Sequence, residues 1–228
     1  MPNPATMSTP SSPAPARPVA LVTGASRGLG FAIAAALGAR GWHVVAVART
    51  TGGLEELDDR IQTAGGSATL APMDVTDADA MAHLAGSVAQ RWGGLGLWVH
   101  TAIHAAPLSP AGHVDAEDFD KSVACNLRAT AVLIPLIEPL LRACDGTALF
   151  LDDPRAGEKF FGTYGATKAA QIALARSWQA ETATIGPRVL IETPLPCATA
   201  TRARFFPGED RSRLANLDAE AERLIALI

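Results

Sequence analysis

The 228-residue sequence predicts an α/β fold, in which a doubly wound parallel sheet of six strands is flanked by helices. Two observations support this prediction. Short apolar segments alternate with longer segments of helical periodicity about six times along the chain. The apolar segments are continuous rather than alternating in polarity, which is typical of strands buried on both faces of a sheet. Ligands of such a sheet bind beyond the carboxyl ends of its strands.

The six strands are expected where β-branched and other apolar residues run together between glycine-rich or polar stretches. In chain order these segments are 19–22, 43–48, 67–73, 95–103, 146–152 and 187–193. Right-handed crossovers should make neighbouring strands parallel. A closing seventh strand is not expected, because the last segment has a helical pattern that reaches Ile228.

Helices are expected between the strands, and most of them end near a glycine or a polar turn. Their approximate ranges are 31–40, 54–64, 77–92, 116–143, 164–184 and 217–228. Asp77 is suited to cap the third of these helices, because its carboxylate can accept from a free amide of the first turn. Pro135 and Pro139 interrupt the long fourth helix and are expected to kink it.

Composition excludes several classes of protein and favours one globular domain at 18–228. The sequence is 48% hydrophobic and has a net charge of −4, so no basic excess indicates nucleic acid or a membrane as a partner. No apolar run reaches the roughly 18 residues of a membrane helix. Three scattered cysteines indicate neither disulfides nor zinc and favour the cytoplasm. Residues 1–17 are proline-rich and are expected to form a disordered tail.

A glycine-rich loop, TGASRGLG at 23–30, lies between the first strand and the first helix. Glycine permits a tight turn and a close backbone approach, and the start of a helix offers free amide groups to a pyrophosphate. A tight turn without a ligand is the alternative. The loop is expected to bind a dinucleotide through Gly24, Ser26, Arg27, Gly28, Leu29 and Gly30.

The end of the second strand indicates which dinucleotide is bound. An acidic residue there would bind the ribose 2′-hydroxyl of NAD(H), but the chain reads Val47-Ala48-Arg49-Thr50-Thr51. Arg49 and Arg27 are suited to a 2′-phosphate, so NADP(H) is favoured over NAD(H). Two solvated surface arginines are the alternative. Asp74, after the third strand, is suited either to the adenine amino group or to a turn.

Tyr164 and Lys168 are four residues apart and therefore share one face of the predicted helix. A phenol has a pKa near 10, and a neighbouring ammonium group stabilises the phenolate and lowers that pKa. Such a tyrosine can give a proton to a carbonyl oxygen or take one from an alcohol. The spacing alone is common on protein surfaces, and the glycine-rich loop upstream makes it specific.

Together the TGASRGLG loop and Tyr164-x-x-x-Lys168 resemble the short-chain dehydrogenase/reductase family over about residues 18–206, and Asn126 in CNLRAT lies where that family carries an active-site asparagine. The resemblance implies a Rossmann-type fold and hydride transfer between NAD(P)(H) and a carbonyl or alcohol carbon of a small molecule. It implies that Tyr164 is the acid/base, that Lys168 also holds the nicotinamide ribose, and that Asn126 supports a water relay. Further cofactor contacts are expected from Thr50, Val75, Thr101, Tyr164, Lys168 and Pro194. A homodimer through the long helices around Asn126 and Tyr164 is also expected.

The sequence departs from the family pattern where the family has a serine, because Asp152-Asp153 stands there. An ionised aspartate cannot donate to an oxyanion, and losing one such donor typically costs about 10²–10³ in rate. The two acids are suited to share a proton, to bind a substrate hydroxyl or amine, or to point to solvent. Thr163 is a poor substitute, since it lies about 100° round the helix from Tyr164. The alternative function is therefore a weakened or inactive NADP(H)-binding sensor or scaffold.

Two other regions depart from the pattern or leave the substrate open. The family's Asn-Asn-Ala-Gly is replaced by HTAI at 100–103, and its Pro-Gly by Pro194-Leu195. His100 and His104 lack an evident third ligand, so they are expected to line the nicotinamide pocket rather than to bind metal. Ile103 in place of glycine should crowd the cofactor. The segment 193–215 is expected to cover the substrate, and its arginines either bind an anionic substrate or lie in solvent above Phe205 and Phe206: Arg202, Arg204, Arg211 and Arg213.

Overall fold

The computed structural model describes residues 17–228 and contains one six-stranded sheet in the order β3-β2-β1-β4-β5-β6. Every neighbouring pair is parallel, which confirms the predicted doubly wound topology. The order reverses between β1 and β4, so their carboxyl ends border the crevice where ligands of such sheets bind. The strands are β1 Val19–Thr23, β2 His43–Ala48, β3 Ser67–Pro72, β4 Leu97–His100, β5 Thr147–Leu151 and β6 Arg188–Glu192. The tail predicted at 1–17 lies outside the described residues except for Arg17.

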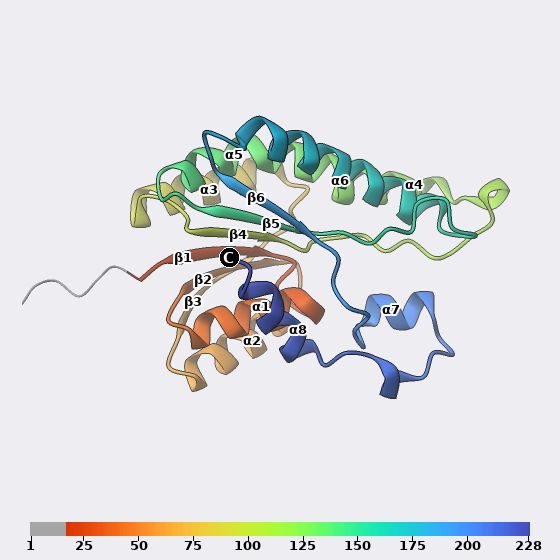
Figure 1. Ribbon diagram of the computed structural model, residues 1–228, viewed down its shortest axis with the longest axis horizontal. Helices are drawn as coiled ribbons and strands as arrows, with labels where there is room; N and C mark the ends of the chain where they lie inside the picture. The colour runs from red at the N-terminus through yellow and green to blue at the C-terminus, as the bar shows by residue number, and fades with distance from the viewer. Residues whose placement is uncertain (1–16) are drawn as a thin grey trace, which may run out of the picture.

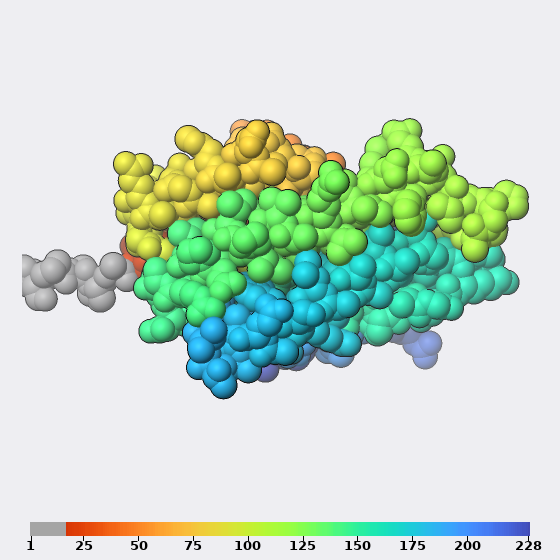
Figure 2. All heavy atoms as spheres, turned by 90° about the horizontal axis from the view of Figure 1, so that it is seen from above, coloured from red at the N-terminus to blue at the C-terminus, as the bar shows by residue number. Residues whose placement is uncertain are grey.

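Helices cover both faces of the sheet in two layers (Figure 1). One layer contains α1 Gly28–Ala39, α2 Thr51–Thr63 and α8 Leu217–Ile225. The other contains α3 Ala78–Trp92, α4 Ala116–Ser122, α5 Ala129–Arg142 and α6 Gly162–Thr182, and α3, α5 and α6 lie side by side in Figure 2. A short helix, α7 Ala200–Phe205, lies beyond the carboxyl ends of the strands, in the segment expected to cover the substrate.

The core explains why the strands are apolar on both faces. Leu97 and Val99 of β4 pack towards α1, α2 and α8, whereas Trp98 between them packs towards α3, α5 and α6. The Trp98 ring meets the Phe150 ring of β5 edge to face, with 5.2 Å between centroids. Since these side chains are fully buried, β4 and β5 are held rigidly at the point where the candidate site begins.

The long helix expected at 116–143 is interrupted, but not at its prolines. Pro135 and Pro139 lie inside α5, whereas a π-helical segment, Val123–Arg128, separates α4 from α5. Such wide turns insert an extra residue into a helix and are frequent at functional sites, and this one carries Asn126. Contrary to expectation, Ala116–Arg142 is long and apolar enough to cross a membrane by length and composition alone. Leu133, Ile137 and Leu141 of this stretch are core residues.

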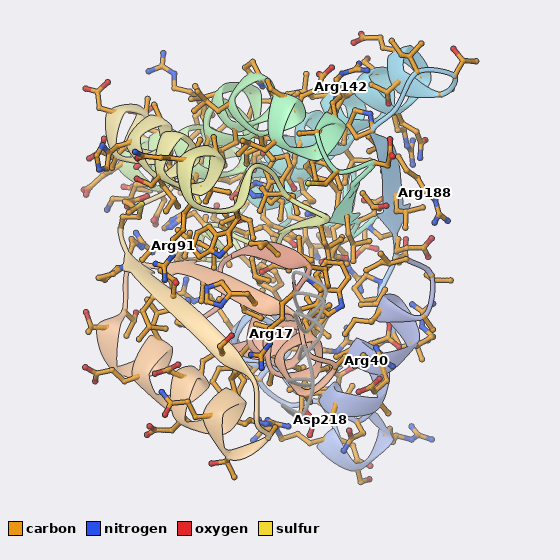
Figure 3. The ribbon with its side chains drawn as sticks, turned by 90° about the vertical axis from the view of Figure 1, so that its left-hand side faces the viewer. Arg17, Arg40, Arg91, Arg142, Arg188 and Asp218 are labelled. Carbon is orange, nitrogen blue, oxygen red and sulfur yellow. The ribbon has the colours of Figure 1, made fainter. Side chains whose placement is uncertain are left out.

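Helix ends follow the expected chemistry in part. The Asp77 carboxylate accepts from the amide of Ala80 at 3.0 Å and caps α3, as predicted. Helix α2 begins three residues earlier than expected, at Thr51. Figure 3 looks onto the amino ends of the strands, at the end of the sheet that lies away from the candidate site. Arg40 of α1 pairs there with Glu222 of α8, and this ion pair joins the two helices.

Candidate active site

The glycine-rich loop turns tightly over the carboxyl end of β4. Gly24 has a φ of 85°, and its amide donates to the Val47 carbonyl at 2.8 Å. A β-carbon on Gly24 would lie 2.7 Å from the amide nitrogen of Ala102. A β-carbon on Gly30 would overlap the Thr101 hydroxyl and the Gly24 carbonyl. The loop therefore requires glycine at both positions, as a cradle for a phosphate does.

The start of α1 is suited to an anion. Arg27 occupies the N-cap position in an extended conformation, and among residues 17–228 no side chain caps this helix. Its first amide groups, from Gly28 to Gly30, are thus available to a ligand. Thr199 lies over the loop, because its methyl carbon is 3.5 Å from where a β-carbon of Gly28 would be. Sequence reasoning missed Thr199, whose only signal is its position as the cap of α7.

Arg49, one of the two arginines expected to select NADP(H), lies beside Asp74 at the ends of β2 and β3. Arg49 is exposed, and its guanidinium lies 3.6 Å from an Asp74 carboxylate oxygen. The other Asp74 oxygen accepts from the Thr76 amide at 2.9 Å, so Asp74 has the turn role that the sequence left open. Arg27 and Thr50 are also exposed, Ser26 and Pro194 are half-buried, and Val75 is buried.

Tyr164 lies in the first turn of α6 and is 3% exposed. Its hydroxyl donates to an Asp153 carboxylate oxygen at 3.1 Å. Its ring packs against Phe205, with 4.8 Å between centroids, and against Phe161, and Ile103 packs against the cluster that these three rings form. Burial raises the pKa of Tyr164 well above its usual value, and the charge and hydrogen bond of Asp153 raise it further.

The two aspartates in place of the family serine have different surroundings. Asp153 faces the phenol, and its second oxygen lies 3.1 Å from the Arg155 guanidinium. Asp152 lies 3.6 Å from the guanidinium of Arg176 on α6. The structure therefore identifies Asp153 as the aspartate in contact with the candidate acid/base. Neither carboxylate supplies a hydrogen-bond donor when it is ionised.

Lys168 is 4% exposed and lies one turn after Tyr164 on α6. Its ammonium group donates to the side-chain oxygen of Gln171 at 2.7 Å. Burial lowers the pKa of Lys168 to about 8, although the charges of Asp152 and Asp153 act in the opposite direction. The ammonium group is therefore directed towards Gln171 in the interior.

Asn126 is fully buried in the π-helical segment. Its side-chain oxygen accepts from the His104 amide at 2.7 Å, and its side-chain nitrogen donates to the His104 carbonyl at 3.0 Å. The same nitrogen donates to the Thr167 hydroxyl at 3.0 Å. Asn126 thus ties the segment after β4 to the helix that carries Tyr164 and Lys168.

Of the two histidines expected to line the nicotinamide pocket, His100 differs from expectation. The His100 ring lies in the core between β1 and α5, where Nδ1 is 2.7 Å from the Thr23 hydroxyl and Nε2 is 3.0 Å from the Thr130 hydroxyl. Burial, followed by the charge of Lys168, lowers the pKa of His100 to about 3. His100 therefore supports the site from within and does not line the pocket. His104 Nε2 faces a carboxylate oxygen of Asp118 at 3.2 Å.

The segment beyond β6 covers the phenol with Phe205, as the second alternative for this segment anticipated, but Arg202 and Arg204 are not merely solvated as that alternative held. Phe205 is buried on Tyr164. Arg202 makes two hydrogen bonds to the Glu209 carboxylate, at 2.5 and 2.6 Å, and Arg204 donates to the Ala105 carbonyl. These arginines are thus engaged within the protein.

Known proteins are similar to this chain in sequence. A family model described as short chain dehydrogenase matches residues 18–210. Fatty acyl-CoA reductase of Acinetobacter baylyi is 30% identical over 167 residues, which are 72% of this chain but 57% of that longer protein. D-threitol dehydrogenase of Mycolicibacterium smegmatis is 28% identical over 202 residues, which are 87% of this chain and 77% of the relative.

A solved structure extends the comparison to the fold. An alcohol dehydrogenase from the archaeon Thermococcus sibiricus, complexed with 5-hydroxy-NADP, is 25% identical and superimposes with a TM-score of 0.80. The superposition covers 92% of this chain and 90% of that one. Because the family match spans most of the sequence and its motifs meet at one edge of the sheet, the chain belongs to the short-chain dehydrogenase family.

Proposed function

We propose that this protein is an NADP(H)-dependent oxidoreductase that transfers a hydride between the nicotinamide and a carbonyl or alcohol carbon of a small molecule. The observation that carries the proposal is the convergence of the glycine-rich loop, Tyr164, Lys168 and Asn126 at the carboxyl edge of the sheet. A dinucleotide on this loop would be held by Gly24, the amides from Gly28 to Gly30, and Lys168.

The residues of the chain would handle the proton. The nicotinamide supplies or accepts the hydride when it is bound. During reduction Tyr164 gives its hydroxyl proton to the carbonyl oxygen, and the Lys168 ammonium stabilises the phenolate that remains. Asn126 fixes the segment after β4 relative to α6 through its hydrogen bonds to both. To reach a substrate, the Tyr164 hydroxyl must exchange its hydrogen bond to Asp153 for one to the substrate oxygen.

A second candidate function rests on Asp153. Its carboxylate accepts the phenol hydrogen and raises the pKa of Tyr164, and both effects oppose proton transfer. A protein that binds NADP(H) without turnover, as a sensor or scaffold, is consistent with this contact. We favour the enzyme because the tyrosine, lysine and asparagine positions are all retained.

Cofactor preference and assembly are parts of the proposal. The exposed guanidinium groups of Arg49 and Arg27 support a 2′-phosphate ligand, and the Thermococcus relative was solved with an NADP derivative. A homodimer would form through α5 and α6, which share one face of the molecule (Figure 2). We expect the protein to act in the cytoplasm.

Nucleotide binding followed by turnover tests the function. Thermal shifts with NADPH and NADH should be larger for NADPH. NADPH consumption is then measured over a panel of aldehydes, ketones and acyl thioesters, with Tyr164→Phe as control. Turnover that depends on Tyr164 supports the enzyme, and binding without such turnover supports the sensor. Failure to bind either nucleotide contradicts both functions.

A further inference from the structure

We propose that Gln171 is a positioning residue for Lys168, and that its side-chain amide holds the lysine ammonium group in place and in its charged form. The proposal rests on the proposed function, because it assigns to Gln171 the support of the group that stabilises the Tyr164 phenolate. Gln171 does not reach the phenol and acts through the lysine alone.

The geometry of the Gln171 amide supports this role. The side chain is buried, with 1% of its surface exposed. Its oxygen accepts from the Lys168 ammonium at 2.7 Å, and its nitrogen donates to the Thr130 hydroxyl at 3.0 Å. An ammonium group can only donate, so the amide oxygen must face Lys168. One amide thus links the candidate catalytic lysine to α5.

The far end of this link is anchored in rigid elements. The Thr130 hydroxyl donates to the Asn126 carbonyl at 3.1 Å and also meets His100 Nε2 at 3.0 Å. His100 in turn meets the Thr23 hydroxyl at the end of β1. All of these side chains are buried, so neither Thr130 nor His100 is free to move. Gln171 therefore presents its oxygen to Lys168 in a fixed position.

Gln171 also affects the protonation of Lys168, because the lysine is buried and carries a charge. The charges of Asp152 and Asp153 favour the ammonium form of Lys168. His100 is also near and stays neutral, and Tyr164 lies one turn before Lys168 on α6. Burial alone favours the uncharged amine. A neutral oxygen at 2.7 Å stabilises the ammonium form by a charge-assisted hydrogen bond.

The sequence contained a signal for this residue. Tyr164, Lys168 and Gln171 are spaced i, i+4 and i+7, so all three lie on one helical face. That face is the buried one, where a glutamine is uncommon and needs partners for both ends of its amide.

The titration of Lys168 tests the proposal directly. The sequence contains three lysines, so protein carrying ¹³C-labelled lysine gives few signals, and Lys168→Arg identifies the one from Lys168. The full chain is titrated as wild type, Gln171→Met and Gln171→Glu. Gln179→Met is the matched control, because Gln179 lies on α6 but donates to the Val189 carbonyl.

Gln171→Met removes the acceptor and is expected to lower the Lys168 midpoint by about one pH unit. Gln171→Glu introduces a negative charge and is expected to raise it, while Gln179→Met leaves it unchanged. A midpoint unmoved in both Gln171 variants overturns the proposal. If Gln171→Met does not fold, as judged by circular dichroism, the proposal is judged by Gln171→Glu alone: a raised Lys168 midpoint supports it and an unchanged midpoint overturns it.

The pH profile of turnover separates this inference from the proposed function. If the function is correct, the basic limb of kcat moves in parallel with the Lys168 midpoint. If the midpoint moves while the wild type shows no NADPH turnover over the carbonyl panel, the proposed function fails and the positioning role remains. If Lys168→Met abolishes turnover and the midpoint is unmoved in the Gln171 variants, only the positioning role fails.

Discussion

Replacing Asp153 with serine is expected to increase turnover of neutral carbonyl substrates. In the present structure the carboxylate accepts the hydrogen of the Tyr164 hydroxyl at 3.1 Å. When Tyr164 gives up its proton, a phenolate forms beside this negative charge. Serine removes the charge and brings a hydroxyl donor to the position where the substrate oxygen gains charge.

The size of the effect follows from two contributions of the same sign. Two like charges 3.1 Å apart repel each other by about 5 kcal/mol at an effective dielectric constant of 20. Arg155, at 3.1 Å from the other carboxylate oxygen, offsets a large part of this repulsion. A new donor to the oxyanion contributes about 10²–10³ in rate. We therefore expect kcat to rise by about 10².

The assay is NADPH consumption with the most active substrate of a carbonyl panel, measured for the wild type and Asp153→Ser. Asp152→Ser is the matched control, because Asp152 pairs with Arg176 and not with the phenol. A tenfold or greater loss of turnover in Asp153→Ser, with nucleotide binding intact, would refute the reasoning. Such a loss would mean that the carboxylate itself takes part in turnover.

Three further predictions concern the cofactor and the fold. Arg49→Ala should weaken NADPH binding roughly tenfold or more and leave NADH binding unchanged, as calorimetry can measure; an equal loss for both would contradict a 2′-phosphate contact. Gly30→Ala should abolish nucleotide binding, since its β-carbon overlaps the Gly24 carbonyl, whereas Gly86→Ala in the open interior of α3 should stabilise the protein by up to about 1 kcal/mol. His100 stays neutral in the folded state, so the unfolded state gains a proton first as pH falls below 6.5. Protonation of this histidine in the unfolded state should thus lower the free energy of unfolding by about 2 kcal/mol at pH 5. Chemical denaturation of His100→Asn should show a flatter dependence of this free energy on pH than that of the wild type.

Much of the fold was predictable because it depends on local patterns. The strands could be found from continuous apolar segments, and their parallel order follows from the alternation of strand and helix. The irregular turn at Asn126 was not predictable, because prolines are the visible helix breakers and a π-helical turn has no comparable signal. Pro135 and Pro139 instead lie within α5.

The candidate site was predictable only where its residues belong to short motifs. The glycine-rich loop and the Tyr164–Lys168 pair are local in sequence, and the structure brings both to one edge of the sheet. The contact between Asp153 and the phenol depends on a loop conformation that spacing does not specify. The role of Gln171 could not be predicted, because it depends on a contact with Thr130, which is distant in sequence.

Transfer of deuterium from NADPH deuterated at the nicotinamide C4 tests the central claim most directly. Mass spectrometry of the product is compared between the wild type and Tyr164→Phe under equal nucleotide saturation. We predict deuterium on the product carbon in the wild type and a rate lower by about 10²–10⁴ in Tyr164→Phe, with NADPH affinity unchanged. Tight NADPH binding with no transferred deuterium, or transfer at the same rate in both proteins, would contradict hydride transfer assisted by Tyr164.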